Sequence, residues 1–286
     1  PVRTLVNTHF HWDHTQGNRA YLSRNHGDKV EIIASTATKQ LMDQLLVPRL
    51  QAALDLSSPG PRGSQQVARQ LQDLKRHVES ATSEAQKSPF LERIAQLQSF
   101  AAEMKDFGPA LPTMTFENSY VIREKGYDLH LQFHGCGHTA GDIVVFCPQK
   151  RIVVTGDAHH SGFPGFIDSY PQLWPKQVDS ILNLQFDQVL PGHGRAEHDR
   201  RAMIGRRHFI QELTERVIAG KKAGQSAPDL QRSITAASLK SLRAQAFLPD
   251  ANPDTIESGV KNCIDNMYDR VEKVSFTGTE PIRLRG

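Results

Sequence analysis

The sequence has little of several residue types that would assign it to a special class of protein. It contains three cysteines in 286 residues, Cys136, Cys147 and Cys263, with no Cys-x-x-Cys pair, so a disulfide framework is not expected. No apolar run approaches the roughly 20 residues that a membrane-spanning helix requires. Neither sign of charge dominates, since 34 Lys and Arg face 31 Asp and Glu. This balance indicates neither a nucleic-acid partner nor an anionic membrane surface.

What the sequence does contain is a dense group of histidines near its first residue. Three histidines and one aspartate fall within the six residues from His9 to His14. Neutral imidazole suits zinc and similar divalent ions, and a carboxylate adds a hard oxygen ligand. His9 and His11 are two positions apart and can point the same way, whereas Asp13 and His14 are adjacent and must point differently. One short loop can therefore serve two metal ions.

Four runs of β-forming residues each end in a candidate metal ligand. The first, residues 2–6, leads directly into the histidine cluster. The other three are residues 129–133 before Gly137-His138, residues 151–155 before Gly156-Asp157, and residues 186–190 before Pro191-Gly192-His193-Gly194. Glycine permits sharp turns and close approach of the backbone. Side chains at the carboxyl ends of several strands can converge on one edge of a sheet, so we expect one metal centre built from all four segments.

These motifs, in this order, resemble the metallo-β-lactamase superfamily of metal hydrolases. The resemblance covers residues 1–36 and about 110–195 and implies an α/β protein with the αβ/βα fold. That fold is a four-layer sandwich with two β-sheets face to face and helices outside. Family members normally carry further strands before the first motif, on the order of 50 residues. N-terminal strands are therefore expected to be missing here, and any signal peptide would have preceded Pro1, which leaves the localisation unassigned.

Carried over residue by residue, the resemblance implies two metal sites with seven ligands. The first site would be His9, His11 and His138, the second would be Asp13, His14 and His193, and Asp157 would bridge them. The bridging aspartate separates this sequence from the true β-lactamases of the superfamily and brings it closer to the glyoxalase II-like and lactonase-like branches. The implied cofactor is two Zn²⁺ per chain, with iron or manganese as alternatives.

Two metal ions about 3.5 Å apart can share a hydroxide that attacks the carbonyl of a small ester, thioester, lactone or amide. Asp13 is the candidate to orient this nucleophile or to shuttle a proton. His159 or His160, which follow the bridging aspartate, can donate a proton to the leaving group; the alternative for both is an ordinary surface loop. Further candidates, which either line the pocket or anchor the next helix, are Asp168, Tyr170 and Trp174.

Two other functions stay open. A mononuclear iron oxygenase, like the persulfide dioxygenases of the same superfamily, would use fewer of the ligands, and the complete second set argues against it. A nucleic-acid-processing or non-catalytic member would be expected to show a basic channel with interleaved aromatics, or a lost ligand. Neither feature is present in the sequence. The expected partner is a small-molecule substrate, without nucleic acid or membrane.

The whole chain, residues 1–286, is expected to form one domain with a helical insertion at about residues 39–108. Apolar residues recur at intervals of three and four from Val67 to Ala85 and from Phe90 to Met104. This spacing predicts two amphipathic helices packed as an antiparallel pair, with Pro89 in the first turn of the second. The insertion is expected to be a lid over the metals, a surface for forming a homodimer, or a packed decoration without a role in the chemistry.

Three further segments carry structural predictions. Residues 114–116, 120–123 and 129–133 are expected to form a β-meander, and residues 143–147 and 151–155 a hairpin. A helix over residues 199–222 carries four arginines, Arg200, Arg201, Arg206 and Arg207. We interpret these arginines as a solvated face.

Overall fold

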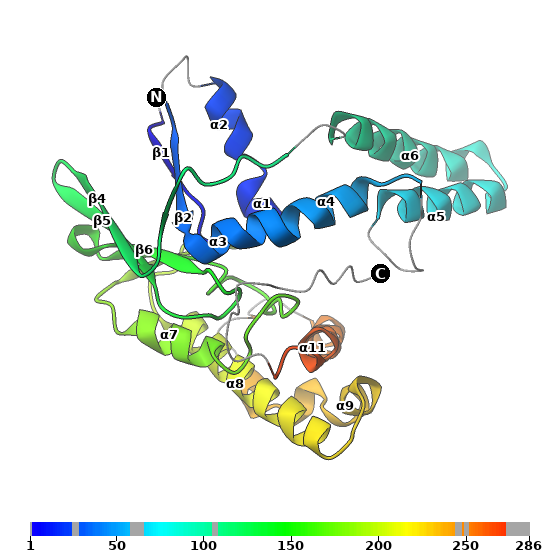
Figure 1. Cartoon of the computed structure of the whole chain (residues 1–286). Helices are drawn as coiled ribbons and strands as arrows, with labels where there is room; N and C mark the ends of the chain where they lie inside the picture. Colours follow the sequence, from blue (N-terminus) through cyan, green and yellow to red (C-terminus); the bar gives the residue numbers. More distant parts are fainter. Residues whose placement is uncertain are drawn as a thin grey trace.

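The computed structural model describes residues 2–24, 29–57, 66–104, 108–243, 248 and 252–272. Its centre consists of two β-sheets (Figure 1). The first sheet is parallel and has the order β1 (Thr4–Val6), β2 (Glu31–Ser35) and β3 (Met114–Phe116). The second sheet follows the sequence order: β4 (Ser119–Glu124), β5 (Tyr127–Phe133), β6 (Ile143–Cys147), β7 (Ile152–Gly156) and β8 (Gln188–Pro191). All neighbours in the second sheet are antiparallel except β7 and β8, which are parallel.

Apolar side chains from both sheets form the core between them. Ile33 of β2 and Phe116 of β3 pack in one cluster with Leu131 of β5 and Ile143 of β6. In the second sheet, Leu129, Leu131 and Phe133 of β5 alternate along the strand and all pack in this cluster, which gives that sheet an inner apolar face. This packing places the carboxyl ends of β1, β5 and β7 near one another, and the candidate ligands follow those ends.

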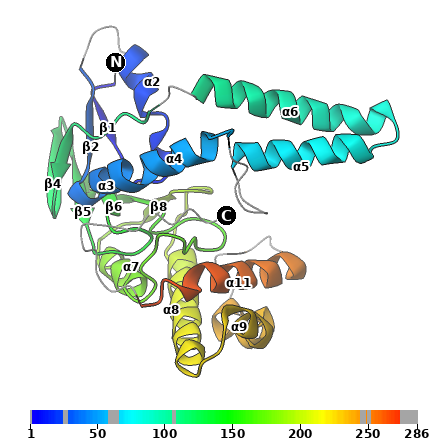
Figure 2. The ribbon, with the colours of Figure 1, turned by 45° about the vertical axis from the view of Figure 1, so that its right-hand side comes forward.

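Helices cover the sheets on the outside (Figures 1 and 2). A large apolar cluster joins β6, β7 and β8 to helices that follow them in sequence. These helices are α7 (Trp174–Leu182), α8 (Arg201–Lys222), α9 (Ala227–Ser233), α10 (Lys240–Arg243) and α11 (Pro253–Tyr268). Near the first sheet lie α1 (Trp12–Thr15), α2 (Asn18–Arg24) and α3 (Thr36–Leu41). Among the described residues, none of the helices combines the length and the apolar character needed to cross a bilayer.

The residues between β2 and β3 are largely helical. After α3 comes a π-helical turn, Met42–Leu46, and then α4 (Val47–Leu54). Pro48 explains the π turn, because its ring has no N–H and would clash with the carbonyl one α-helical turn back. Two long helices follow, α5 (Val67–Ser80) and α6 (Glu84–Met104), which lie side by side and project from the sheets (Figure 2).

The α5–α6 pair has its own apolar cluster, in which Val67 and Leu71 pack against Leu97 and Ala101. The predicted pairing of two amphipathic helices is therefore present. The predicted position of Pro89 is wrong, because α6 already begins at Glu84. The start signal lies upstream of the proline, where the backbone N–H and the hydroxyl of Thr82 both donate to the Gln86 side chain, at 2.9 and 3.0 Å. The expectation that this pair joins two copies of the chain stays a prediction, which the mass of the protein in solution would check.

The predicted meander is also wrong, whereas the predicted hairpin is confirmed. Strand β3 pairs in parallel with β2, with Met114 opposite Ile33, so it belongs to the first sheet, and only β4 and β5 form an antiparallel pair. The chain crosses between the sheets directly after Phe116, a step that sequence spacing does not reveal. Strands β6 and β7 are joined by the short 3₁₀ turn Pro148–Lys150, and Arg151 adopts the left-handed conformation, with φ 52°.

Candidate metal centre

The loop between β1 and α2 is held in place by a pair of side-chain amides. The amide nitrogen of Asn7 donates to Asn18 at 3.0 Å, and the amide nitrogen of Asn18 donates back at 2.9 Å. The hydroxyl of Thr15 donates to the carbonyl of His11 at 3.0 Å. Because Asn7, Thr15 and Asn18 are buried, these bonds are shielded from water and set the direction in which the histidines of the loop point.

Three histidines from two segments form a first group. Nε2 of His9 lies 3.2 Å from Nδ1 of His11, and Nε2 of His138 lies 2.9 Å from the same nitrogen. His9 and His138 are buried, with 1% and 4% of their surfaces exposed. One ring nitrogen from each of the three histidines and one carboxylate oxygen of Asp157 all lie within 4.8 Å of one another. That spacing suits four ligands around one ion.

A second group lies beside the first and faces solvent. It consists of Asp13, His14 and His193. Oδ2 of Asp13 lies 3.3 Å from Nε2 of His14 and 3.1 Å from Nε2 of His193, and the two histidine nitrogens are 3.2 Å apart. The side chains of Asp13 and His193 are about half exposed, at 54% and 48%. Asp13 and His193 are therefore far more open to water than His9 and His138 of the first group.

Asp157 connects the two groups. Its Oδ1 lies 3.4 Å from Nε2 of His14, and its Oδ2 lies 3.4 Å from Nε2 of His193 and 3.5 Å from Nε2 of His138. The structure thus brings all seven predicted ligands together, in the grouping that the sequence implied. Oδ1 of Asp157 is buried and has no hydrogen-bond partner. A buried carboxylate oxygen without a donor is costly, and a cation at this position would satisfy it.

Burial favours the uncharged form of His9, His14 and His138. It lowers the pKa of His9 and of His138 well below the usual histidine value, and the neighbouring imidazoles lower both further. Burial also lowers the pKa of His14, although the carboxylates of Asp157 and Asp13 act in the opposite direction. Neutral imidazole is the form that binds a metal ion, so these residues fit metal ligation without first losing a proton.

A family model described as the metallo-beta-lactamase superfamily matches residues 1–251. The chain belongs to the metallo-β-lactamase superfamily. Its members are mostly metal-dependent hydrolases, and the two groups described above can bind metal in this chain. The fold is the metallo-β-lactamase fold, with the sandwich of sheets and helices that the resemblance implied.

Individual superfamily members are distant. The chain is 29% identical over 110 residues to metallo-beta-lactamase type 2 of Bacteroides fragilis, covering 34% of this chain and 44% of that protein. The sec-alkylsulfatase Pisa1 from Pseudomonas sp. has a TM-score of 0.56 and 13% identity, covering 100% of this chain and 43% of that one. A metallo-beta-lactamase from Pontibacter korlensis has a TM-score of 0.44 and 19% identity, covering 74% and 70%. The likeness to the sec-alkylsulfatase structure shows the fold alone, and the chain spans less than half the length of the Bacteroides relative.

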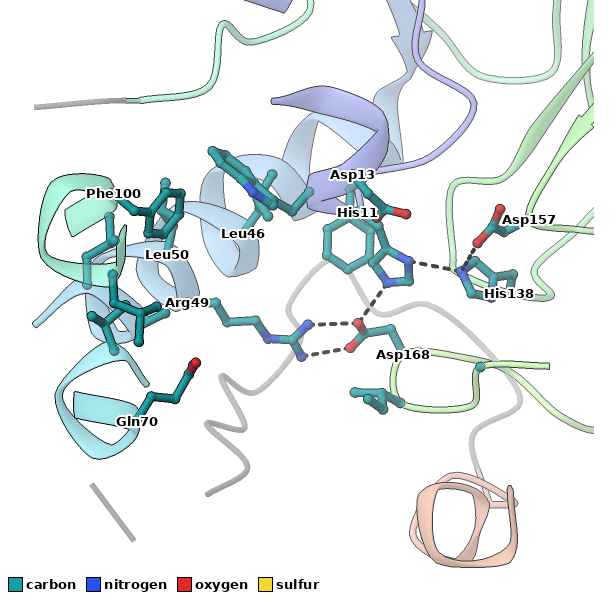
Figure 3. Close-up of a pocket in the computed structure, with 18 of the residues that line it drawn as sticks. His11, Asp13, Leu46, Arg49, Leu50, Gln70, Phe100, His138, Asp157 and Asp168 are labelled. Carbon is teal, nitrogen blue, oxygen red and sulfur yellow. Dashed lines mark hydrogen bonds and ion pairs between the residues drawn. The ribbon is translucent and has the colours of Figure 1, made fainter. Parts of the chain in front are cut away.

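In this superfamily member, one histidine of the candidate metal centre is held by an ion pair that reaches α4, between β2 and β3. Nε2 of His11 donates to Oδ2 of Asp168 at 3.0 Å, which leaves Nδ1 directed at the other ligands (Figure 3). Arg49 of α4 donates to both oxygens of Asp168, each at 2.7 Å. Burial alone would raise the pKa of Asp168, but the hydrogen bonds from Arg49 and His11 outweigh it and hold that pKa well below the usual range. Sequence reasoning proposed Asp168 as a pocket residue but missed Arg49.

His159 and His160 lie beside the centre, and each has a protein partner. Nε2 of His159 donates to the carboxylate of Glu197 at 2.9 Å. Nδ1 of His160 donates to the carbonyl of Ser161 at 2.6 Å, and its Nε2 accepts from Arg206. Burial, followed by the charge of Arg206, lowers the pKa of His160 to about 2. The role of either histidine as proton donor to the leaving group stays a prediction, and this geometry gives both a role in holding the loop after Asp157.

The interpretation of the basic stretch as a solvated face is wrong for Arg206, which is only 1% exposed. Its guanidinium donates to the carbonyls of His160 and Gly162. Burial lowers the pKa of Arg206 to about 9, while the negative charge of Asp157 opposes that shift. Arg200 also donates inward, to the carbonyls of Leu182, Leu184 and Phe186. The other two candidate pocket residues, Tyr170 and Trp174, are buried and act as anchors, with Nε1 of Trp174 donating to the carbonyl of Ala158 at 3.0 Å.

Gly192 lies so close to Asp157 that a side chain has no room. A Cβ at this position would fall 1.9 Å from Oδ1 of Asp157. We expect Gly192→Ala to displace the carboxylate and weaken metal binding about 10–100-fold, the usual cost of disturbing the support of a metal ligand. Gly165→Ala is the matched control, because its added methyl group would meet Cε1 of His138 at an ordinary 3.5 Å. Zinc titration of both variants, with equal zinc affinity as the contradicting result, checks this prediction.

Proposed function

We propose that this chain is a hydrolase that holds two divalent metal ions, zinc in preference to iron or manganese, and cleaves a small ester, thioester, lactone or amide. The observation that carries the proposal is the position of Asp157, whose carboxylate lies between the two groups, 3.4 Å from His14 and His193 of one group and 3.5 Å from His138 of the other. A single-iron oxygenase would have no use for the second group. With both groups complete, the hydrolase is the function that this geometry supports best.

When bound, two metal ions would supply a water with a lowered pKa and a Lewis acid for a carbonyl oxygen. Side chains of this protein would position the substrate, accept a proton and offset positive charge. His11, Asp13, His138 and Asp157 all line one cavity, so a substrate in it faces both groups. Asp13 is the exposed carboxylate among them and is placed to accept a proton from an attacking water. The carboxylate of Asp157 offsets positive charge between the two groups.

Elemental analysis of protein purified without added metal is the first test. About two zinc ions per chain would support the proposal, whereas about one iron would favour the oxygenase. A substrate screen should then include an ester, a thioester and a lactone. It should also include a β-lactam and a secondary alkyl sulfate, because the similar proteins named above bear the names of enzymes that act on such groups. Absence of any hydrolysis by zinc-loaded protein would contradict the proposal.

We expect a chelator to remove metal in two phases. The second group is half exposed whereas His9, His138 and Asp157 are buried, so an ion on the exposed side should leave first. Hydrolysis should fall with the first phase, since both ions are needed, and should return when zinc is added back. Metal release and residual activity, followed in the same samples, check this. Loss of both ions in one phase would contradict the difference in exposure between the two groups.

A further inference from the structure

One cavity joins the metal ligands to the helical insertion. Its volume is about 880 Å³, and at one end it is lined by His11, Asp13, His138 and Asp157. From there it runs to α4, α5 and α6, which Figure 3 shows on the opposite side from the ligands. The reacting group of a substrate needs only the end near the metals. The remaining volume can hold a further part of the same molecule.

The end of the cavity at the insertion is apolar. Its lining includes Leu46, Leu50, Leu54, Val67, Leu97 and Phe100. Phe100 of α6 is 42% exposed, and Ile167, which lines the cavity from the loop after β7, is 49% exposed. Large apolar side chains left open to water around one cavity indicate a surface that an apolar ligand covers.

The charged groups along the cavity do not favour an anionic tail. Arg49 lines the wall, but both of its terminal nitrogens already donate to Asp168 at 2.7 Å. Arg93 at the insertion end donates to the neutral side chain of Gln96 at 3.2 Å and is exposed, so its charge lies in water at the rim of the cavity. Between this rim and the metal ligands, the only charged pair among the described residues of the lining is Arg49 with Asp168, and the two charges offset each other. Such a wall fits a hydrocarbon chain better than a charged or sugar-like group.

We propose that the substrate carries an extended apolar acyl chain, which lies against α4, α5 and α6 while its carbonyl faces the metal ligands. This inference rests on the proposed hydrolase function and names the substrate class. The insertion then acts as the wall of a chain-binding site, which is closest to the lid among the three roles that the sequence left open. The continuity of the apolar surface with the metal ligands is what identifies the occupant as part of the substrate.

Binding of saturated carboxylates tests the chain site separately from catalysis. Acetate, butyrate, hexanoate and octanoate are titrated into the zinc-loaded protein by calorimetry. Each added methylene that leaves water should raise the affinity about threefold to fourfold. An affinity that does not change with chain length would overturn the inference.

Two substitutions in α4 test where the acyl chain of the ligand lies. Ala53 of α4 lines the cavity and its neighbour Ala52 does not. In Ala53→Phe the added ring occupies the space of the chain, so the ratio of octanoate affinity to acetate affinity should fall about tenfold. Ala52→Phe makes the same change outside the cavity and should keep the wild-type ratio. Thermal unfolding of both variants verifies that each is folded, and equal ratios in the two would overturn the inference.

A parallel series of p-nitrophenyl esters, from acetate to octanoate, separates this inference from the proposed function. If carboxylate affinity rises with chain length but no ester is hydrolysed, the proposed hydrolase function is wrong and the acyl-chain site is supported. If the esters are hydrolysed but neither the rate nor the affinity depends on chain length, the hydrolase function is supported and the acyl-chain site is wrong. If a second copy of the chain covers the apolar end instead, light scattering would give the mass of a dimer, and carboxylate binding would not depend on chain length. That result also overturns the inference.

Discussion

Replacing Asp157 with alanine is expected to lower hydrolysis about a thousandfold and to lower bound metal below two ions per chain. The carboxylate is buried and lies between the two groups, with Oδ1 3.4 Å from Nε2 of His14 and Oδ2 3.4 Å from Nε2 of His193 and 3.5 Å from Nε2 of His138. Without it, two cations would face each other with no buried anion between them. Their repulsion in a site shielded from water costs far more than the loss of one exposed ligand.

Metal content per chain and kcat/KM on the best substrate of the screen are the two measurements. Asp187→Ala is the matched control, because Asp187 is 62% exposed and paired with Arg151. It should keep both the metal and the activity. If Asp157→Ala kept two zinc ions and wild-type hydrolysis, the proposed mechanism would be wrong. The thermal midpoint of each variant distinguishes a lost metal bridge from a lost fold.

The candidate metal ligands could be predicted from the sequence because each of them lies in a short, recognisable sequence pattern. His138, Asp157 and His193 each follow a glycine within a few residues of the end of a β-rich run, and the carboxyl ends of the strands converge at one edge. Local patterns also reveal amphipathic helices, which is why the α5–α6 pair could be anticipated. The division of the seven candidate ligands into two groups came from the resemblance to the superfamily and not from these local patterns.

The supports of the ligands could not be predicted, since they depend on contacts between distant parts of the chain. Arg49 and Asp168 are separated by 119 positions, and nothing near Arg49 marks it as the partner of a buried carboxylate. Arg206 lies in a helix whose periodicity shows an apolar face but not that a guanidinium will be buried against His160. The assignment of β3 to the first sheet has the same origin, because a three-residue strand carries too little pattern to choose a neighbour.

Replacing Arg49 with alanine is expected to weaken zinc binding and to destabilise the fold. Asp168 would lose two hydrogen bonds of 2.7 Å and keep only the one from His11. Leaving a buried carboxylate partly unpaired costs on the order of 2–4 kcal/mol, less than for a fully buried pair because the Arg49 side chain is 24% exposed. His11 would then be oriented less firmly, and loss of such support typically costs about 10–100-fold in metal affinity.

Two further variants make the result specific. Arg49→Lys keeps the positive charge but cannot form the two-pronged pair, so its zinc affinity should fall between those of the wild type and Arg49→Ala. Arg76→Ala removes an exposed arginine of α5 that pairs with Asp73 one turn away, and it should leave zinc affinity unchanged. Zinc titrations and urea unfolding of the metal-free protein report the two effects separately. Equal zinc affinity in Arg49→Ala and Arg76→Ala would refute the role of the ion pair.

Through the same ion pair, metal binding and the position of α4 should each affect the other. If Arg49 supports the zinc ligand His11 through Asp168, then zinc must in turn hold Arg49, and with it α4, because a coupling free energy acts equally in both directions. We therefore expect zinc to slow amide hydrogen exchange in residues 47–54 of the wild type, and to slow it much less in Arg49→Ala. Because α4 also lines the cavity, loading the metal would then order one wall of the acyl-chain site before any substrate arrives.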